Sequence, residues 1–326
     1  MTGLPLVTTT SRSTFRRCPQ KWVWRFEDGL TQKGETADAL WFGTGVHEAL
    51  AKWYLRGARR GPRPADTFDN WCSNEMREIR ASREEWEDQA KYEDALELGI
   101  AMLDNYIQEY GADDNWDIVA IEQPFKIRVT WHGKPVALFM STWDGVYRDR
   151  KDGKLYLLEH KTASQITLPY LALDDQAGVY LAVAEQWLKT KNIMRQNEHI
   201  AGIMYNFLRK TMGDDRDRNE GGAYLNKDGS VSKKQPPPPF VRNLVERGPG
   251  ESRTQMERLA NEVAVMNAVR DGTIPVTKST TKDCTWCEFF YVCTLHERGS
   301  TTAFNEYVRH GFTKKNPFDR YQKSAG

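Results

Sequence analysis

The 326-residue sequence contains no run of 18 or more apolar residues, so a membrane-spanning helix is excluded. It has almost no net charge, with 46 Lys and Arg against 45 Asp and Glu, which excludes attraction to nucleic acid by the field of the whole molecule. No G-x-x-x-x-G-K-[ST] loop occurs, so no ATP-driven motor is expected in this chain. Residues 1–13 lack a basic segment followed by an apolar run, which predicts no secretory signal and a reducing, cytoplasmic location.

Aromatic residues are abundant, with 11 Trp, 13 Tyr and 13 Phe, so the chain can build a sizeable core. Apolar residues at helical spacing predict helices, and short β-branched or aromatic runs between turn residues predict the strands of an antiparallel meander. Together they indicate an α/β fold. The expected helices are 11–27, 43–55, two between 68 and 110, 173–189 and 253–270, and the expected strands are 118–122, 125–131, 136–148, 155–161 and 200–208.

We expect a single domain over residues 1–310. Within it, the charged segment 35–115 is expected to be a helical insertion, and the Gly-, Asp- and Pro-rich segment 213–250 is expected to be an exposed loop. Residues 311–326 carry several lysines and arginines and are expected to be a basic tail without fixed structure.

An acid and a base lie together at the end of one predicted strand. Because side chains alternate along a strand, Glu159 and Lys161 share one face while His160 points to the other. Pairing this strand with the preceding one as a hairpin would bring Asp144 close to Glu159. Two neighbouring carboxylates suit a hard cation such as Mg²⁺ or Mn²⁺, which lowers the pKa of bound water and stabilises charge on a phosphate. Taken alone, Glu-x-Lys is also common on solvated surfaces, and Asp144 also fits a turn.

Three further residues could complete such a site. His47 follows a small-residue turn at the start of a predicted helix, from which an imidazole can reach a metal; a partly buried helix histidine is the alternative. Gln176 and Tyr180 lie one turn apart on a helix and could hydrogen-bond a phosphate or a base edge. Ordinary packing is the alternative for this pair.

Three of the five cysteines, Cys284, Cys287 and Cys293, fall within ten residues, which is typical of a metal centre in a reducing compartment. A tetrahedral site needs a fourth ligand, and Cys18 is the best candidate, although it is distant in sequence. Such a site would staple the start of the chain to its end and leave Cys72 as a buried free thiol. Four cysteines serve both zinc and a [4Fe–4S] cluster, so the spacing alone leaves the metal open.

Basic residues alternate with aromatic residues around the two predicted N-terminal helices. They could form a groove that contacts phosphates and stacks bases, as in proteins that bind single strands, with Arg16, Arg17 and Lys21 as candidates for DNA binding. A solvated basic face above core aromatics is the alternative. The residues are Arg12, Arg16, Arg17, Lys21, Arg25, Arg56, Arg59, Arg60 and Arg63, with Trp22, Trp24, Trp53 and Tyr54 among them.

In order and spacing, the candidate site residues resemble the RecB-type branch of the PD-(D/E)XK nuclease superfamily: His47, Asp144, Glu159-His160-Lys161 and Gln176-x-x-x-Tyr180. The resemblance implies a restriction-endonuclease-like mixed sheet flanked by helices. It also implies the roles of the residues. His47, Asp144, Glu159 and the backbone carbonyl of His160 would bind Mg²⁺ or Mn²⁺; Asp144, Glu159 and Lys161 would be catalytic; and Gln176 and Tyr180 would contact DNA. Glu122 falls where these nucleases often carry an accessory acid, and a surface salt bridge is its alternative.

The cysteines add a second resemblance. Cys18 lies in a Ser-x-Ser-x-Phe-x-x-Cys-Pro setting over residues 11–19. With Cys284, Cys287 and Cys293, this setting resembles the iron–sulfur branch shared by AddB-type nucleases and the CRISPR-adaptation exonuclease family. The resemblance implies a structural [4Fe–4S] cluster, with Zn²⁺ as the alternative.

The expected activity is metal-dependent hydrolysis of DNA, as an exonuclease on single strands or free ends, with endonuclease or flap activity in addition, in recombination, replication or repair. Because no motor is expected, a separate helicase, recombinase or CRISPR-adaptation protein is the expected partner, in a prokaryotic or phage-infected cell. Two alternatives stay open. One is a catalytically inert DNA-binding scaffold, and the other is a partner-dependent nuclease that trims DNA in CRISPR spacer acquisition.

Overall fold

The computed structural model describes residues 3–33, 39–82, 89–214 and 216–319. The backbone separates into two compact units, each assembled from segments far apart in the sequence. Strands β3 (Trp116–Trp131) and β4 (Lys134–Asp149) each contribute residues to both units. The central unit comprises residues 37–122 and 143–249, and the terminal unit comprises residues 1–36, 123–142 and 250–326.

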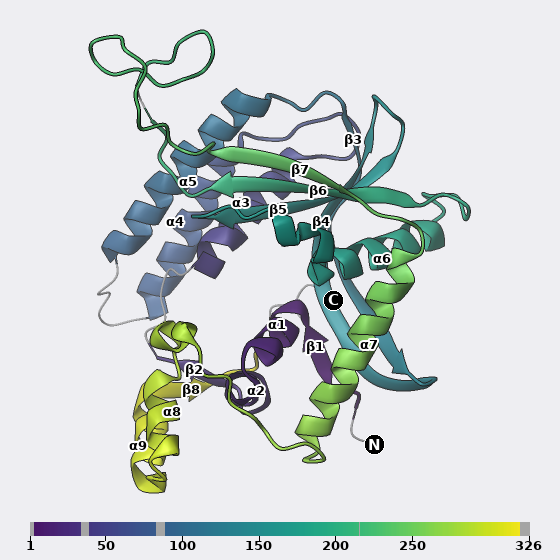
Figure 1. Ribbon diagram of the computed structural model, residues 1–326, viewed down its shortest axis with the longest axis vertical. Coiled ribbons are helices and arrows are strands. Elements are labelled where there is room, and N and C mark those ends of the chain that lie inside the picture. Colours follow the sequence, from purple (N-terminus) through teal and green to yellow (C-terminus); the bar gives the residue numbers. More distant parts are fainter. Residues whose placement is uncertain (1–2, 34–38, 83–88, 215, 320–326) are drawn as a thin grey trace. The chain divides into compact units, whose positions relative to one another are not determined.

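A mixed sheet forms the middle of the central unit (Figure 1). Strand β5 (Leu155–Ala163) pairs antiparallel with β4 and parallel with β6 (Ile200–Arg209), and β7 (Phe240–Glu246) pairs antiparallel with β6. The register joins Gly145 of β4 to Leu158 of β5, so Asp144 and Glu159 are the next residues on the two strands. The predicted α/β fold with a mixed sheet flanked by helices is therefore confirmed.

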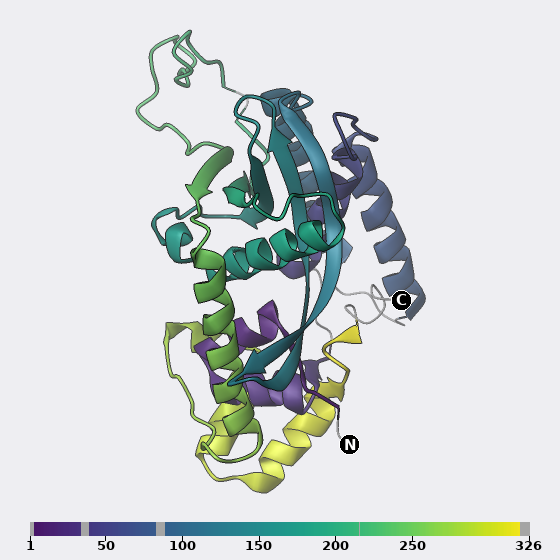
Figure 2. The ribbon, with the colours of Figure 1, turned by 90° about the vertical axis from the view of Figure 1, so that its right-hand side faces the viewer.

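Helices cover both faces of this sheet (Figure 2). On one face, Leu50, Phe68 and Leu103 of three successive helices join a buried apolar cluster that includes Leu158 of β5. On the other face, α6 contacts β5 and β6. Because both faces are covered, residues 155–160 of β5 are all buried. The helices are α3 (Ala39–Trp53), α4 (Pro64–Ser82), α5 (Gln89–Tyr110) and α6 (Asp175–Thr190), the last preceded by the 3₁₀ turn Pro169–Leu173.

Helices α3, α4 and α5 account for most of the expected helical insertion, and they belong to the core of the central unit. Gly99 of α5 permits close packing, because a Cβ there would lie 2.0 Å from the ring of Phe68 on α4. Residues 35–38 and 83–88 of the expected insertion lie outside the described residues.

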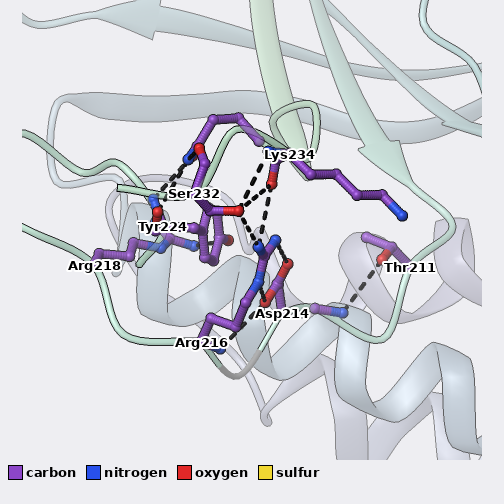
Figure 3. A network of polar contacts seen from close by, with 9 residues as sticks. Thr211, Asp214, Arg216, Arg218, Tyr224, Ser232 and Lys234 are labelled. Carbon is purple, nitrogen blue, oxygen red and sulfur yellow. Dashed lines mark hydrogen bonds and ion pairs between the residues drawn. The ribbon is translucent and has the colours of Figure 1, made fainter. Parts of the chain in front are cut away.

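Polar contacts hold the long connection between β6 and β7 together (Figure 3). Arg216 forms an ion pair with Asp214 at 2.5 Å. The guanidinium groups of Arg216 and Arg218 lie 5.0 and 4.5 Å from the ring centroid of Tyr224. The expected loop over 213–250 is wrong at its C-terminal end, since Phe240–Glu246 pairs with β6 as strand β7.

The terminal unit contains segments from both ends of the chain. Strand β1 (Leu6–Thr8) lies parallel to part of β4, and β2 (Leu30–Gln32) pairs antiparallel with β8 (Phe312–Lys314). The expectation of an unstructured tail after residue 310 is therefore wrong for β8, and residues 320–326 lie outside the described residues. The helices are α1 (Thr9–Arg17), α2 (Pro19–Trp22), α7 (Glu251–Arg270), α8 (Phe290–Glu297) and α9 (Thr301–Gly311), with a π-helical turn at Val23–Glu27 and a 3₁₀ turn at Lys282–Trp286.

The predicted helix 11–27 is broken into these three N-terminal pieces. Cys18 has extended backbone angles, and Pro19 has no amide hydrogen to continue the hydrogen-bond ladder of α1. In the described ranges, no helix combines the length and the apolar character needed to cross a membrane.

Candidate active site

Three side chains with metal-ligand chemistry meet in the central unit, each from a different element. His47 of α3 places Nδ1 3.0 Å from Oδ1 of Asp144 on β4 and 3.9 Å from Oε1 of Glu122 on β3. One ligand atom from each residue lies within 4.8 Å of the other two, and no other group of three His, Cys, Asp or Glu residues in the described part of the chain is this compact. One imidazole nitrogen and two carboxylate oxygens suit a divalent cation that accepts nitrogen and oxygen ligands.

Asp144 is fixed at both of its oxygens. Its Oδ2 accepts a hydrogen bond from the backbone N–H of His160 at 2.6 Å, and its Oδ1 faces His47. Burial alone would raise the pKa of Asp144, but His47 and the His160 N–H outweigh burial and lower it. Burial alone would lower the pKa of His47, but Asp144, Glu122 and Glu159 raise it to about 9. At neutral pH the His47 imidazole is therefore protonated and pairs with the Asp144 carboxylate.

Glu159 and Lys161 lie on the same face of β5, as their alternation predicts. Oε1 of Glu159 accepts from Nζ of Lys161 at 2.6 Å and from Nε2 of Gln176 at 3.2 Å. Oε2 of this 2 % exposed residue has no hydrogen-bond partner in the part of the chain that the structure describes. Burial raises the pKa of Glu159 to about 7, although Lys161 lowers it in part. A buried carboxylate oxygen without a partner is costly, so Oε2 fits a ligand position for a cation.

Asp174 is a site residue that the sequence analysis missed. It caps α6, with Oδ1 accepting from the backbone N–H of Gln176 at 3.0 Å, and Oδ2 accepts from the Tyr205 hydroxyl at 3.1 Å. Burial alone would lower the pKa of Lys161, but Glu159 and Asp174 outweigh it and raise that pKa. Asp174 therefore orients the first turn of α6 and keeps Lys161 charged. The available signal was an Asp at the start of the predicted helix 173–189, where a helix N-cap is expected.

The two residues expected to contact DNA, Gln176 and Tyr180, have different environments. Gln176 is half-buried, whereas Tyr180 is 4 % exposed. The Tyr180 hydroxyl lies 3.5 Å from Nε2 of Gln176. Gln176 is therefore the better candidate for direct contact with DNA, and Tyr180 is placed to orient the Gln176 side chain.

Glu122 has a strained backbone. Its φ of +39° lies in the left-handed region, which residues other than glycine rarely adopt. Burial and the charge of Asp144 raise the pKa of Glu122 to about 8, while His47 lowers it in part. Backbone strain of this kind is concentrated at functional sites, where the surrounding structure maintains it.

A buried polar network holds the His160 ring on the opposite face of β5. Nδ2 of Asn206 lies 2.8 Å from Nδ1 of His160, and because an amide nitrogen donates, we assign the ring proton to Nε2. Burial lowers the pKa of His160 to about 3, so the ring is neutral and does not serve as a base near pH 7. Asn206 in turn accepts from Arg242 of β7 at 3.3 Å. Arg242 forms a bidentate pair with Asp113, at 2.5 and 2.8 Å.

Replacing Arg242 with methionine is expected to destabilise the protein by about 3–5 kcal/mol, because the Asp113 carboxylate, 7 % exposed, would remain buried without its partner. Urea denaturation would measure the change. The double variant Arg242→Met/Asp113→Leu is the matched control, and it should recover part of the loss. A loss below about 1 kcal/mol for Arg242→Met would show that this pair does not support the sheet behind His160.

The structure does not support the iron–sulfur staple or its zinc alternative. The four cysteines, Cys18, Cys284, Cys287 and Cys293, lie in the terminal unit, but among the described residues no three of their sulfurs lie within 4.8 Å of one another. Cys287 and Cys293 also pack against an apolar cluster. Burial raises the pKa of both thiols, and Cys284 adds to the shift of each, as Cys18 does for Cys293. Sγ of Cys284 contacts the backbone of its own loop. Cys72 is buried with a free thiol, as expected.

The basic residues near the N-terminus do not form one exposed groove. Arg12 is 1 % exposed and pairs with Glu262 at 2.5 Å, so its expected surface position is wrong. Arg16 lies 3.5 Å from the same carboxylate, and Lys21 pairs with Glu288 at 2.6 Å. Arg17 is exposed. These residues belong to the terminal unit, whereas the ligand cluster belongs to the central unit.

Comparison with known proteins finds one family whose profile matches this chain and several solved structures that are similar to it. The profile of the PD-(D/E)XK nuclease superfamily matches residues 7–294. None of the curated proteins matches the chain significantly. A structure described as "Putative exonuclease" from Eubacterium rectale is 10% identical, with 88% of this chain and 87% of that chain covered and a TM-score of 0.42. A structure described as SSO0001 is 12% identical, with 90% of this chain and 87% of that chain covered and a TM-score of 0.35.

Proposed function

The chain belongs to the PD-(D/E)XK nuclease superfamily, and from this membership we propose that it is a divalent-metal-dependent exonuclease that degrades single-stranded DNA from free ends. Endonuclease or flap cleavage would be a secondary activity of the same site. Such an enzyme would trim DNA ends in recombination, replication or repair. A separate helicase or recombinase would work beside it.

One observation carries the proposal: a half-satisfied buried carboxylate, Glu159, lies beside a charged lysine and near a compact His–Glu–Asp set. The proposed ligands for Mg²⁺ or Mn²⁺ are His47, Glu122, Asp144, Glu159 and the backbone carbonyl of His160. When bound, the cation lowers the pKa of water and stabilises charge on the phosphate. His47 would have to lose its proton to serve as a ligand, because only a neutral imidazole nitrogen has a free lone pair.

Lys161 would act beside this cation. Its side chain is 24 % exposed, so it can reach a phosphate while Glu159 and Asp174 keep it protonated. A fixed positive charge in a largely buried site stabilises the extra negative charge of the pentavalent phosphate and orients the attacking water. Gln176 donates a hydrogen bond to Glu159. The side-chain carbonyl oxygen of Gln176 can accept a further hydrogen bond, with which it would orient the strand that is cleaved.

Circular and linear single strands of identical sequence would test the proposed specificity. An exonuclease degrades the linear strand and leaves the circle intact, and an endonuclease cuts both. The linear duplex of the same sequence is the control for strand preference. Cleavage of the circle at the rate of the linear strand would overturn the exonuclease assignment. Binding without cleavage under Mg²⁺ and Mn²⁺ would overturn the nuclease assignment and leave a DNA-binding scaffold or a nuclease that needs a partner.

Metal binding should depend strongly on pH. The raised pKa values, about 9 for His47, about 8 for Glu122 and about 7 for Glu159, mean that the metal-free folded state binds protons more tightly than the unfolded state. Their contribution to stability is therefore full below the unfolded pKa values and is lost as pH rises through about 7 to 9. Mg²⁺ must displace these protons, so its affinity rises over the same window.

We expect saturating Mg²⁺ to raise the melting temperature by at least about 3 °C more at pH 8.5 than at pH 6, as measured by calorimetry. Asp144→Asn is the control, and the variant should lose the metal-induced shift at both pH values. A shift of equal size at pH 6 and pH 8.5 would contradict this ligand set.

A further inference from the structure

The terminal unit contains a cavity of about 560 Å³ that lies between the end of β3 and helix α7. Arg128, Trp131 and His132 line one wall, and Arg253, Glu257 and Asn261 line the other. None of the lining residues belongs to the ligand cluster of the candidate active site. The volume falls in the range of small-ligand pockets, which is roughly 300–1,000 Å³.

Trp131 is fixed at this cavity with part of its surface exposed. Its indole N–H donates to Oδ1 of Asn261 at 3.1 Å, and the side chain is 40 % exposed. The ring of His132 stands nearly perpendicular to the indole, with centroids 4.3 Å apart. His132 and Gly133 both have positive φ angles, +46° and +75°, as in the tight hairpin turns that end paired strands. The indole is therefore held in one orientation before any ligand binds.

Positive charge is available on both walls. The side chains of Arg128 and Arg253 are exposed, and neither forms an ion pair with any residue that the structure describes. Glu257 is the one carboxylate among the lining residues. A partly exposed indole in a cavity with an arginine on each wall is the combination that proteins use for single-stranded nucleic acid, where the aromatic ring stacks on a base and the cations contact phosphates.

We propose that this cavity binds one nucleotide of single-stranded DNA, with its base stacked on Trp131 and its flanking phosphates contacted by Arg128 and Arg253. The inference rests on the proposed function, because it adds a strand-binding site to the same substrate. A duplex conceals the faces of its bases within the stack, so the site selects single strands. The carboxylate of Glu257 repels phosphate. The two arginines are therefore the phosphate contacts, and the indole is the base contact.

The test measures the affinity of a fluorescent oligothymidylate by anisotropy, in Mg²⁺, with all variants made in the Lys161→Met background to slow cleavage. Trp131→Ala should weaken binding about 5- to 100-fold, whereas Trp131→Phe, which retains a stacking face, should stay within about threefold. Trp286→Ala is the matched control, because Trp286 is 89 % exposed and lies outside the cavity. Arg128→Ala/Arg253→Ala should lower the slope of log affinity against log salt by about 1.4. The exposed pair Arg195→Ala/Arg298→Ala, which lies outside the cavity, is the control for charge.

A second measurement needs no variant at the cavity. A strand carrying 5-iodouracil should photocrosslink to the peptide that contains Trp131, as identified by mass spectrometry. Crosslinks elsewhere only, or affinity for Trp131→Ala within twofold of its parent, would overturn the inference. These failures are distinct from failure of the proposed function. If the linear strand is degraded while Trp131→Ala binds normally, the cavity assignment alone is wrong; if the strand is neither bound nor degraded, the proposed function itself is wrong.

Discussion

Asp144→Asn is expected to lower the rate of metal-dependent DNA cleavage by about 10³-fold or more. The substitution keeps the size of the side chain and an oxygen that can accept from the His160 N–H, but it removes the negative charge that faces His47 and that would help to hold the cation. A cation contributes several kcal/mol of charge stabilisation to phosphoryl chemistry, and a loss of about 4 kcal/mol corresponds to a factor of about 10³. Single-turnover degradation of an end-labelled strand would measure the effect.

The matched control for this variant is Asp152→Asn. Asp152 lies in the exposed turn of the same β4–β5 hairpin, so its substitution removes an equal charge from the same pair of strands. We expect its cleavage rate to stay within about twofold of the original. If Asp144→Asn cleaved DNA within about threefold of the unmodified protein, the ligand cluster would not be the catalytic centre.

Lys161→Met is expected to lower the maximal cleavage rate by about 10²–10³-fold, which is the usual effect of removing one fixed donor that stabilises developing charge. Binding of DNA and of Mg²⁺ should remain within about tenfold, because Lys161 contacts Glu159 through a single ion pair and the other ligand positions are intact. The split between rate and affinity distinguishes a residue that acts in the transition state from one that holds the substrate.

Lys189→Met is the matched control for Lys161→Met. Lys189 also forms a largely buried ion pair, with Glu185 of α6 at 2.7 Å, but neither residue belongs to the ligand cluster. It should lower stability without changing the cleavage rate. If Lys161→Met lost affinity for DNA in proportion to its rate, Lys161 would be a binding residue, and our assignment of its role would be wrong.

The parts of the fold that were predictable depend on short-range patterns. Alternation along one strand placed Glu159 and Lys161 on a common face, and the turn at Gly153 set the register that brings Asp144 alongside Glu159. The helix over 173–189 was also predictable, since it agrees with α6 to within a few residues. Each of these features depends on neighbours within about 20 residues, which sequence periodicity reports directly.

The missed features depend on contacts between distant segments. Arg242 lies on β7, in a segment where a proline run and several glycines favour a loop, yet it pairs with Asp113 from a different part of the chain. Arg12 belongs to a basic run that is typical of a solvated face, but Glu262, 250 residues away in sequence, provides the charge that allows its burial. No local pattern encodes partners at such separations.

The most direct test of the central claim is degradation of a 5′-labelled linear single strand, first in Mg²⁺ or Mn²⁺ and then after addition of excess EDTA. We predict loss of the strand with either metal, complete arrest on chelation, and recovery when metal is restored. Unchanged cleavage in EDTA, or no cleavage with either metal from pH 6 to 8.5, would contradict a metal-dependent nuclease centre built from His47, Glu122, Asp144, Glu159 and Lys161.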